Sequence, residues 1–175
     1  MKIYTILIRK FTILTILISF NVFYSCGIIG MNTISGNVEH QEKIHKLYIY
    51  IGAAGSNLDS YSDGFGKYLH NMFLEQGVEN IVYIDNSKKQ LSLSDKTPQE
   101  ELVEYKPTHI LELHLKTERN DPEYLFLLYD VKIINESGDT IWSGNIDMMV
   151  GAGGSNQTEG ASRKLIEKLK NDKII

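Results

Sequence analysis

The order of apolar patterns between residues 46 and 84 constrains the fold of this chain most strongly. Apolar residues alternate with tyrosines over 46–51, which is the period of a β-strand. An apolar stripe with helical spacing follows over 61–76, and Gly77 stands where a helix would end. A second short strand is predicted over 81–84. Strand, helix and strand in this order predict two parallel strands joined by a right-handed crossover.

The second half of the chain predicts an antiparallel meander. Strands are expected over 109–116, 124–135 and 140–150, because short turn sequences separate these alternating segments. A short helix beginning after Thr97 precedes them, and a helix over 156–170 follows them. The sequence therefore predicts an α/β domain of order β-α-β-α-β-β-β-α, with a mixed sheet of about five strands and the helices packed on the sheet.

The last predicted strand indicates which face of the sheet is buried. Its inward residues are expected to be Trp142, Ile146, Met148 and Val150. Polar residues at 143, 145 and 147 alternate with them, so this part of the sheet should meet water on its other face.

A basic and then apolar segment precedes the only cysteine of the chain, Cys26. Residues 1–10 contain Lys2, Arg9 and Lys10, and the uncharged run 11–24 follows and leads to Ser25. This order has the form of a secretory signal peptide. The cysteine at its end resembles the lipobox of bacterial lipoproteins, although Phe23 and Tyr24 depart from the usual leucine and small residue. This resemblance implies cleavage before Cys26, transfer of diacylglycerol to its thiol, and acylation of the new amino group.

Two alternatives to a lipoprotein remain open. The uncharged run continues to Val38, so an uncleaved membrane anchor is one alternative. An ordinary signal peptide cut elsewhere is the other. On the lipoprotein interpretation, residues 1–25 are the signal peptide, 26–45 a lipidated flexible tether, and 46–175 a single α/β domain. The protein would then be exported and lipid-anchored, in the outer membrane facing the periplasm or at the cell surface.

Charge argues against nucleic acid as a partner. Removal of residues 1–25 takes away three basic and no acidic residues, which changes the formal charge from −4 to −7. Nucleic-acid affinity depends on neutralising phosphates, and this acidic domain has no basic cluster. The lipid bilayer is therefore expected as a partner through the acylated Cys26, not through charge.

Three segments give the domain a resemblance to small periplasmic lipoprotein domains: Pro-Thr-His-Ile-Leu-Glu-Leu (107–113), Ser-Gly-Asp-Thr-Ile-Trp-Ser-Gly (137–144) and Ala-Ser-Arg-Lys-Leu-Ile-Glu-Lys-Leu (161–169). It is similar to the periplasmic domain of the curli-secretion lipoprotein and to lipoprotein activators of penicillin-binding proteins. The chain lacks the transmembrane hairpins of the former and the Pro-rich stalk of the latter. The resemblance implies a non-enzymatic, envelope-anchored domain that acts through protein contacts.

A near-duplication of Gly-Ala-x-Gly-Ser-Asn marks two strand-to-helix loops. Such loops can present backbone N–H groups to an anion at a helix N-terminus, but the favoured explanation is that glycine permits tight turns and Ser or Asn caps the helix that follows. The candidate anion-binding residues are Gly52, Gly55, Ser56, Asn57, Gly151, Gly154, Ser155 and Asn156.

Aromatic residues on the faces opposite the aliphatic rows form a second candidate site, a protein-docking face. An alternative is that helices cover both faces of the sheet. The candidate docking residues are Tyr48, Tyr50, Tyr124 and Phe126.

No metal, cofactor or catalytic site is expected. His109 and His114 should point to opposite faces of one strand, and a calcium-like loop at Asp59 has His70 where the bidentate glutamate belongs. We therefore expect a non-enzymatic accessory or adaptor in envelope assembly or maintenance. The alternative function is a lipoprotein that binds an anionic or phosphate-bearing small ligand through the two Gly-rich loops.

Overall fold

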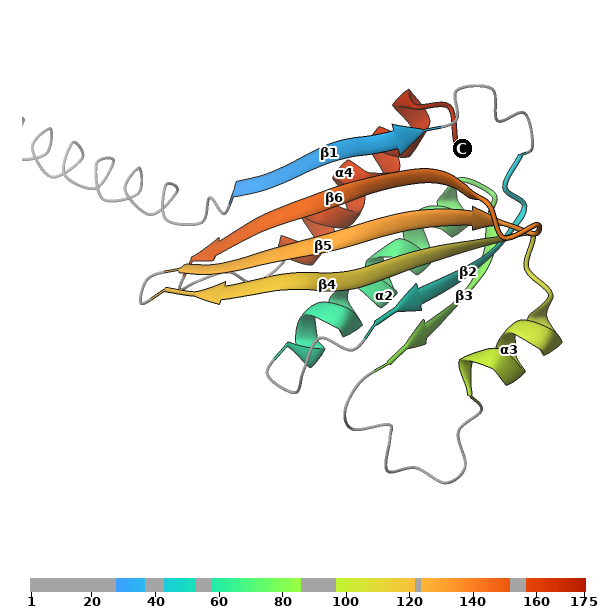
Figure 1. Cartoon of the computed structure of the whole chain (residues 1–175), viewed down its shortest axis with the longest axis horizontal. Coiled ribbons are helices and arrows are strands. Elements are labelled where there is room, and N and C mark those ends of the chain that lie inside the picture. Colours follow the sequence, from blue (N-terminus) through green and yellow to red (C-terminus); the bar gives the residue numbers. More distant parts are fainter. Residues whose placement is uncertain (1–27, 37–42, 53–57, 86–96, 122–123, 152–156) are drawn as a thin grey trace, which may run out of the picture.

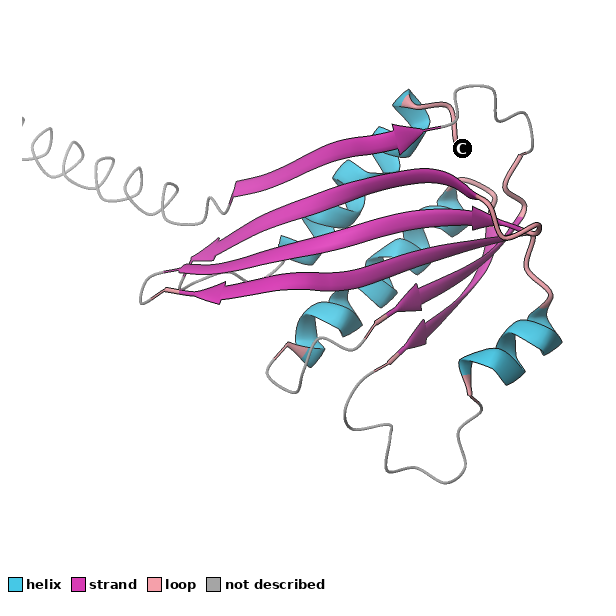
Figure 2. Cartoon of the chain, in the orientation of Figure 1, coloured by secondary structure: helices cyan, strands magenta, loops and turns pink. Residues whose placement is uncertain are grey.

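A mixed six-stranded sheet with two helices against one face forms the body of the protein in a computed structural model (Figures 1 and 2). The structure describes residues 28–36, 43–52, 58–85, 97–121, 124–151 and 157–175. The strands are β1 (Ile28–Gly36), β2 (Lys46–Ile51), β3 (Glu79–Ile84), β4 (His109–Asn120), β5 (Tyr124–Asn135) and β6 (Thr140–Gly151). The helices are α2 (Asp59–Glu75), α3 (Pro98–Tyr105) and α4 (Gln157–Asn171).

The sheet topology confirms the predicted α/β class and its division into two halves. The strand order is β1-β6-β5-β4-β2-β3. Strand β2 pairs in parallel with β3 and β4, whereas β4, β5, β6 and β1 pair antiparallel in succession. The predicted parallel first half and antiparallel meander are therefore both present.

The hydrophobic core lies between the sheet and the pair α2 and α4. Aliphatic residues of β2 and β4 face this core, as do Phe65, Leu69 and Phe73 of α2 and Leu165 and Leu169 of α4. The four residues expected to point inward from β6 are all buried: Trp142, Ile146, Met148 and Val150. Gly77 has φ +75° directly after α2, as expected of a residue that ends a helix.

Strand β1 corrects the prediction of a flexible tether over residues 26–45. Residues 28–36 pair antiparallel with β6, so the sheet has six strands and its first strand begins two residues after Cys26. Ile29 and Met31 pack against the core, whereas Gly30 and Asn32 lie on the other face. The Gly, Asn and Ser content suggested a coil, but an edge strand exposed to water tolerates that composition.

Strand β4 runs to Asn120, whereas the prediction ended it at residue 116, where the alternation is interrupted. The register shifts between Leu115 and Thr117, which leaves Lys116 as the extra residue of a bulge. The alternation therefore changes sides at the point where the prediction ended the strand. Helix α3 has the predicted capping box, in which the Thr97 hydroxyl accepts from the Glu100 N–H and the Glu100 carboxylate accepts from the Thr97 N–H.

Candidate interaction surface

The face of the sheet opposite α2 and α4 is the candidate interaction surface, and we call it the open face. Strand register arranges its side chains in rows that cross β1, β6, β5 and β4. Row 1, at the end of the sheet where β1 begins, contains Ile28, Met149, Phe126 and Arg119. Row 2 contains Gly30, Asp147, Leu128 and Thr117. Row 3 contains Asn32, Asn145, Asp130 and His114.

Rows 1 and 2 form a shallow apolar groove of about 430 Å³, lined by side chains of both rows. Gly30 has no side chain and Thr117 a short one, which leaves space between the larger residues. Ile28 is 64% exposed at the rim of the groove. The Arg119 guanidinium lies 4.5 Å from the centre of the Phe126 ring, a distance typical of a cation–π contact.

A polar and aromatic region occupies the open face beyond row 3. Tyr50 stacks on Tyr83 with ring centres 5.9 Å apart and lies 5.4 Å from the His114 ring. The Tyr50 hydroxyl donates to the Asp85 carboxylate at 3.2 Å. Burial, followed by the negative charge of Asp85 and this hydrogen bond, raises the pKa of Tyr50 to about 12. This region therefore combines flat aromatic surface with acidic groups.

Helix α3 covers the other end of this face, and the prediction of Tyr48 as a docking residue is therefore corrected. Tyr48 is 1% exposed, and its hydroxyl donates to the Glu101 carboxylate of α3 at 3.3 Å. Tyr48 is therefore inaccessible to a partner, and the expectation of a second helix-covered face holds for this part of the sheet. Tyr50 and Phe126 are partly exposed and Tyr124 is 42% exposed, so these three remain candidates.

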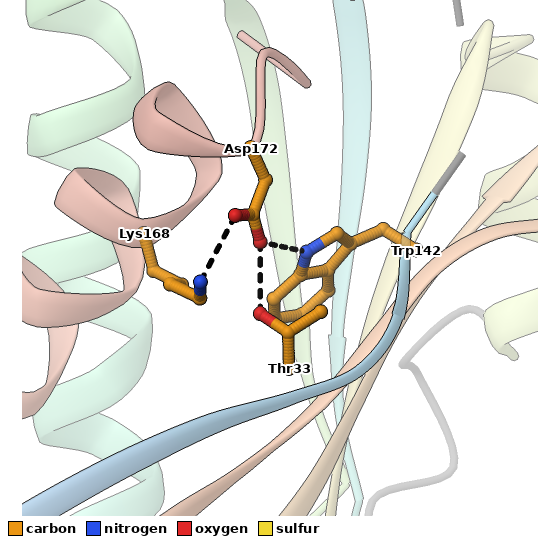
Figure 3. Close-up of polar contacts among 4 residues, drawn as sticks. All are labelled: Thr33, Trp142, Lys168 and Asp172. Carbon is orange, nitrogen blue, oxygen red and sulfur yellow. Dashed lines mark hydrogen bonds and ion pairs between the residues drawn. The ribbon is translucent and has the colours of Figure 1, made fainter. Parts of the chain in front are cut away.

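A partly buried polar network joins β1 to the C-terminal end of α4 (Figure 3). One Asp172 oxygen accepts from the Trp142 indole N–H at 2.9 Å and from the Thr33 hydroxyl at 2.8 Å. The other oxygen pairs with the Lys168 ammonium at 2.9 Å. Burial alone would raise the pKa of Asp172, but the hydrogen bonds from these three residues lower it below its ordinary value. We call these four residues the Asp172 network.

The two Gly-rich loops lie mostly outside the described residues, as do Gly55, Ser56, Asn57, Gly154, Ser155 and Asn156. Their parent strands β2 and β6 are not neighbours, because β4 and β5 separate them. The helices that follow the loops do meet: a Cβ on Gly64 of α2 would lie 2.4 Å from the Thr158 hydroxyl oxygen of α4. Asp59 places a carboxylate in the first turn of α2, which disfavours an anion at that helix end.

The histidines lie on opposite faces of β4, as predicted: His109 is buried and His114 lies on the open face. Within the described ranges, no group of three or more His, Cys, Asp or Glu side chains is placed to hold a metal ion. Cys26 precedes the first described residue. Among the helices that the structure describes, none is long and apolar enough to cross a membrane.

Sequence patterns did not identify Ile28, Gly30 or Asp172 as parts of a site. The alternation of Ile29, Met31 and Thr33 was the signal for β1, and once β1 is placed beside β6 the groove follows. The Asp172 network had no local signal, because Thr33 and Asp172 are 139 residues apart.

No known protein family matches the sequence, and neither does any curated protein. Among solved structures, the PelC dodecamer from Paraburkholderia phytofirmans is 10% identical, with a TM-score of 0.50, over 82% of this chain and 97% of that chain. Lipoprotein GNA1162 from Neisseria meningitidis is 13% identical, with a TM-score of 0.41, over 73% of this chain and 96% of that chain. At these identities the PelC similarity shows a shared fold alone, and the GNA1162 similarity, with its lower TM-score, does not establish a shared fold.

Proposed function

We propose that this protein is an envelope lipoprotein, anchored through Cys26, that acts as a non-enzymatic adaptor by binding a protein partner on the open face of its sheet. The observation that carries the proposal is the position of Cys26 two residues before β1. A lipid on this residue would hold the sheet itself at the membrane. The open face would then be presented to partners within the envelope.

The chemistry of the open face supports protein binding. It offers the stacked pair Tyr50 and Tyr83 beside the partly exposed His114 and Glu112, whose side chains are 48% and 29% exposed. Aromatic residues with polar tips are enriched in protein interfaces, and the surrounding charges would form a polar rim.

Lipidation is tested by labelling the native host with radioactive palmitate. We expect label on the wild-type protein and none on Cys26→Ser. Mass spectrometry of the mature protein should find the N-terminus at residue 26 with acyl groups attached. A bare N-terminus, or equal label on both proteins, would refute the anchor.

Partner binding is tested with a photo-crosslinking amino acid placed at single positions in living cells. Tyr83 and Lys132 report on the open face, and the exposed Arg163 of α4 is the matched control on the opposite side. We expect a reproducible protein adduct from the two open-face positions and none from Arg163. Adducts of equal yield from all three positions, or from none, would contradict a docking role for the open face.

The alternative, an anion-binding lipoprotein, is less well supported by the arrangement of the strands. It would require the loops after β2 and β6 to act together although two strands lie between them. Calorimetry with phosphate and nucleotides tests it, with Asn57→Ala/Asn156→Ala as the matched variant. Ligand heat in the wild type that disappears in the variant would favour this alternative over the adaptor.

A further inference from the structure

The open face changes from apolar to polar along the strands, starting from the end where β1 begins. Row 1 contributes Ile28, Met149 and Phe126 to the apolar groove, whereas row 3 has only amide, carboxylate and imidazole side chains. Monomeric proteins seldom expose a concave apolar surface of this kind without a function. The end of the open face where β1 begins is therefore apolar, unlike the rest of this face.

The groove lies where the chain reaches Cys26. Ile28 is both the first described residue and part of the groove lining. Two peptide units separate it from Cys26, so the two Cα atoms are at most about 8 Å apart. Any lipid carried by Cys26 would therefore enter the membrane within one side-chain length of the groove.

We infer that the apolar groove docks on the membrane leaflet that holds the anchor, with Ile28, Phe126 and Met149 at the boundary between headgroups and acyl chains. This inference rests on the proposed lipidation of Cys26. Arg119 is 68% exposed, stacks on Phe126 and forms an ion pair with Asp121 at 3.3 Å. From this exposed position its guanidinium can also reach a lipid phosphate while its stem covers the ring. Row 3, which is polar, rises from the surface, and Tyr50 and Tyr83 beyond it stay free for a protein partner.

The bilayer fits the groove better than a protein segment does. A peptide that adds to a sheet as a further strand needs a free edge, and most of the groove is lined by β6, β5 and β4, which have neighbours on both sides; only β1, at the rim, has a free edge. The groove is instead a shallow concave face beside the attachment point, and acyl-chain anchoring keeps it at the membrane surface permanently. Lipid headgroups and chain ends can adapt to such a surface without directional hydrogen bonds.

The test uses the full lipidated protein with one introduced cysteine, because acylation leaves Cys26 without a free thiol. The reporter variant is Tyr124→Cys, next to row 1 and 42% exposed in the wild type. The control is Ile34→Cys, on β1 itself and 64% exposed, but about 20 Å from Ile28 along the strand. Each thiol is coupled to an environment-sensitive fluorophore, and the protein is reconstituted into phosphatidylcholine vesicles containing a lipid with a nitroxide at carbon 5.

We expect the label at 124 to lose roughly half of its fluorescence, because a docked interfacial side chain lies about 5–10 Å deep, near the nitroxide. The label at 34 should lose little. Adding Ile28→Asn to Tyr124→Cys should cut the quenching at least twofold while the protein stays with the vesicles. Ile28 is an exposed edge residue, so this change should not unfold the domain.

Several results would overturn the inference. Equal quenching at 124 and 34 would mean that the body tumbles freely or lies in another orientation, although the anchor itself would stand. Energy transfer between labelled copies without nitroxide quenching would assign the groove to a second copy of this chain. Two fluorophores per chain would show that Cys26 is a free thiol, which refutes the proposed anchor and this inference together.

Discussion

Replacing Asp172 with alanine removes the single carboxylate that accepts from the Trp142 indole, the Thr33 hydroxyl and the Lys168 ammonium. We expect this change to destabilise the fold and to loosen β1 in particular. Trp142 is 0% exposed, and the alanine variant removes the Asp172 oxygen that accepts from its N–H. The Thr33 hydroxyl joins β1 to the C-terminal end of α4, in addition to the pairing with β6 and the packing of Ile29 and Met31 on the core.

The magnitude follows from the individual contacts. A hydrogen bond to a charged acceptor contributes about 1.5–3 kcal/mol, and leaving its buried donor unsatisfied costs a similar amount. The Lys168 pair is partly exposed and adds at most about 1 kcal/mol. The free energy of unfolding should therefore fall by about 2–4 kcal/mol, which lowers Tm by on the order of 10 °C for a domain of this size.

The assay is urea unfolding of residues 26–175 carrying Cys26→Ser, followed by tryptophan fluorescence. Trp142 is the only tryptophan, so the signal comes from the Asp172 network itself. Asp172→Asn keeps an oxygen that can accept from the indole and should lose about half as much stability. Asp139→Ala, in the exposed turn between β5 and β6, is the control and should stay within about 0.5 kcal/mol of the wild type. Amide hydrogen exchange should accelerate in β1 of the alanine variant before it does in β4.

The pH dependence gives an independent check. The folded-state pKa of Asp172 is lowered, so its stabilisation is complete above the unfolded value of about 3.9 and is lost as the pH falls through the folded value. The stability difference between wild type and Asp172→Asn should be constant from about pH 5 to pH 8 and shrink below about pH 4. A loss no larger than that of Asp139→Ala, or a difference that persists at low pH, would refute this account of the network.

Two further predictions concern helix packing and alkaline pH. Gly64→Ala should destabilise the fold by about 1–3 kcal/mol despite the higher helix propensity of alanine, because its Cβ would meet the Thr158 hydroxyl at 2.4 Å. Thermal unfolding measures this loss. The control is Gly160→Ala, whose Cβ would meet only the flexible end of an isoleucine, and it should cost less than about 1 kcal/mol. Burial raises the pKa of Tyr50 and of Tyr105 to about 12, so their stabilisation is complete below the unfolded value of about 10 and is lost as the pH rises toward 12. Absorbance titration of tyrosinate should show both groups ionising above pH 11. Tyrosines that all titrate near 10 in the folded protein would contradict the burial of these two side chains.

Local patterns in the sequence were sufficient for most of the fold. Alternation and turn residues located β2, β5 and β6, and the capping box located the start of α3. Each of these signals depends on residues close together in the chain. Strand β1 had only the short alternation of Ile29, Met31 and Thr33 as a signal, because an edge strand with Gly30 and Asn32 on its exposed side has the composition of a coil.

The candidate surface was harder to predict, because it depends on which strands are neighbours. Phe126 was identified as a docking residue from its position opposite the aliphatic row, but its neighbours Ile28 and Met149 come from strands far away in sequence. Tyr48 seemed equivalent to Tyr50 by alternation. Tyr48 is covered by α3 and bonds to Glu101 of that helix, and no local pattern determines where α3 packs.

The pairing of β1 with β6 also sets the order in which the protein can mature. The hydrogen-bonding partners of β1 lie more than 100 residues later in the chain, and the acceptor for the Thr33 hydroxyl is Asp172, 139 residues later. Contacts of such long sequence separation form late in folding. If the protein is exported as proposed, β1 would therefore stay without its partner strand until nearly all of the polypeptide had crossed the membrane.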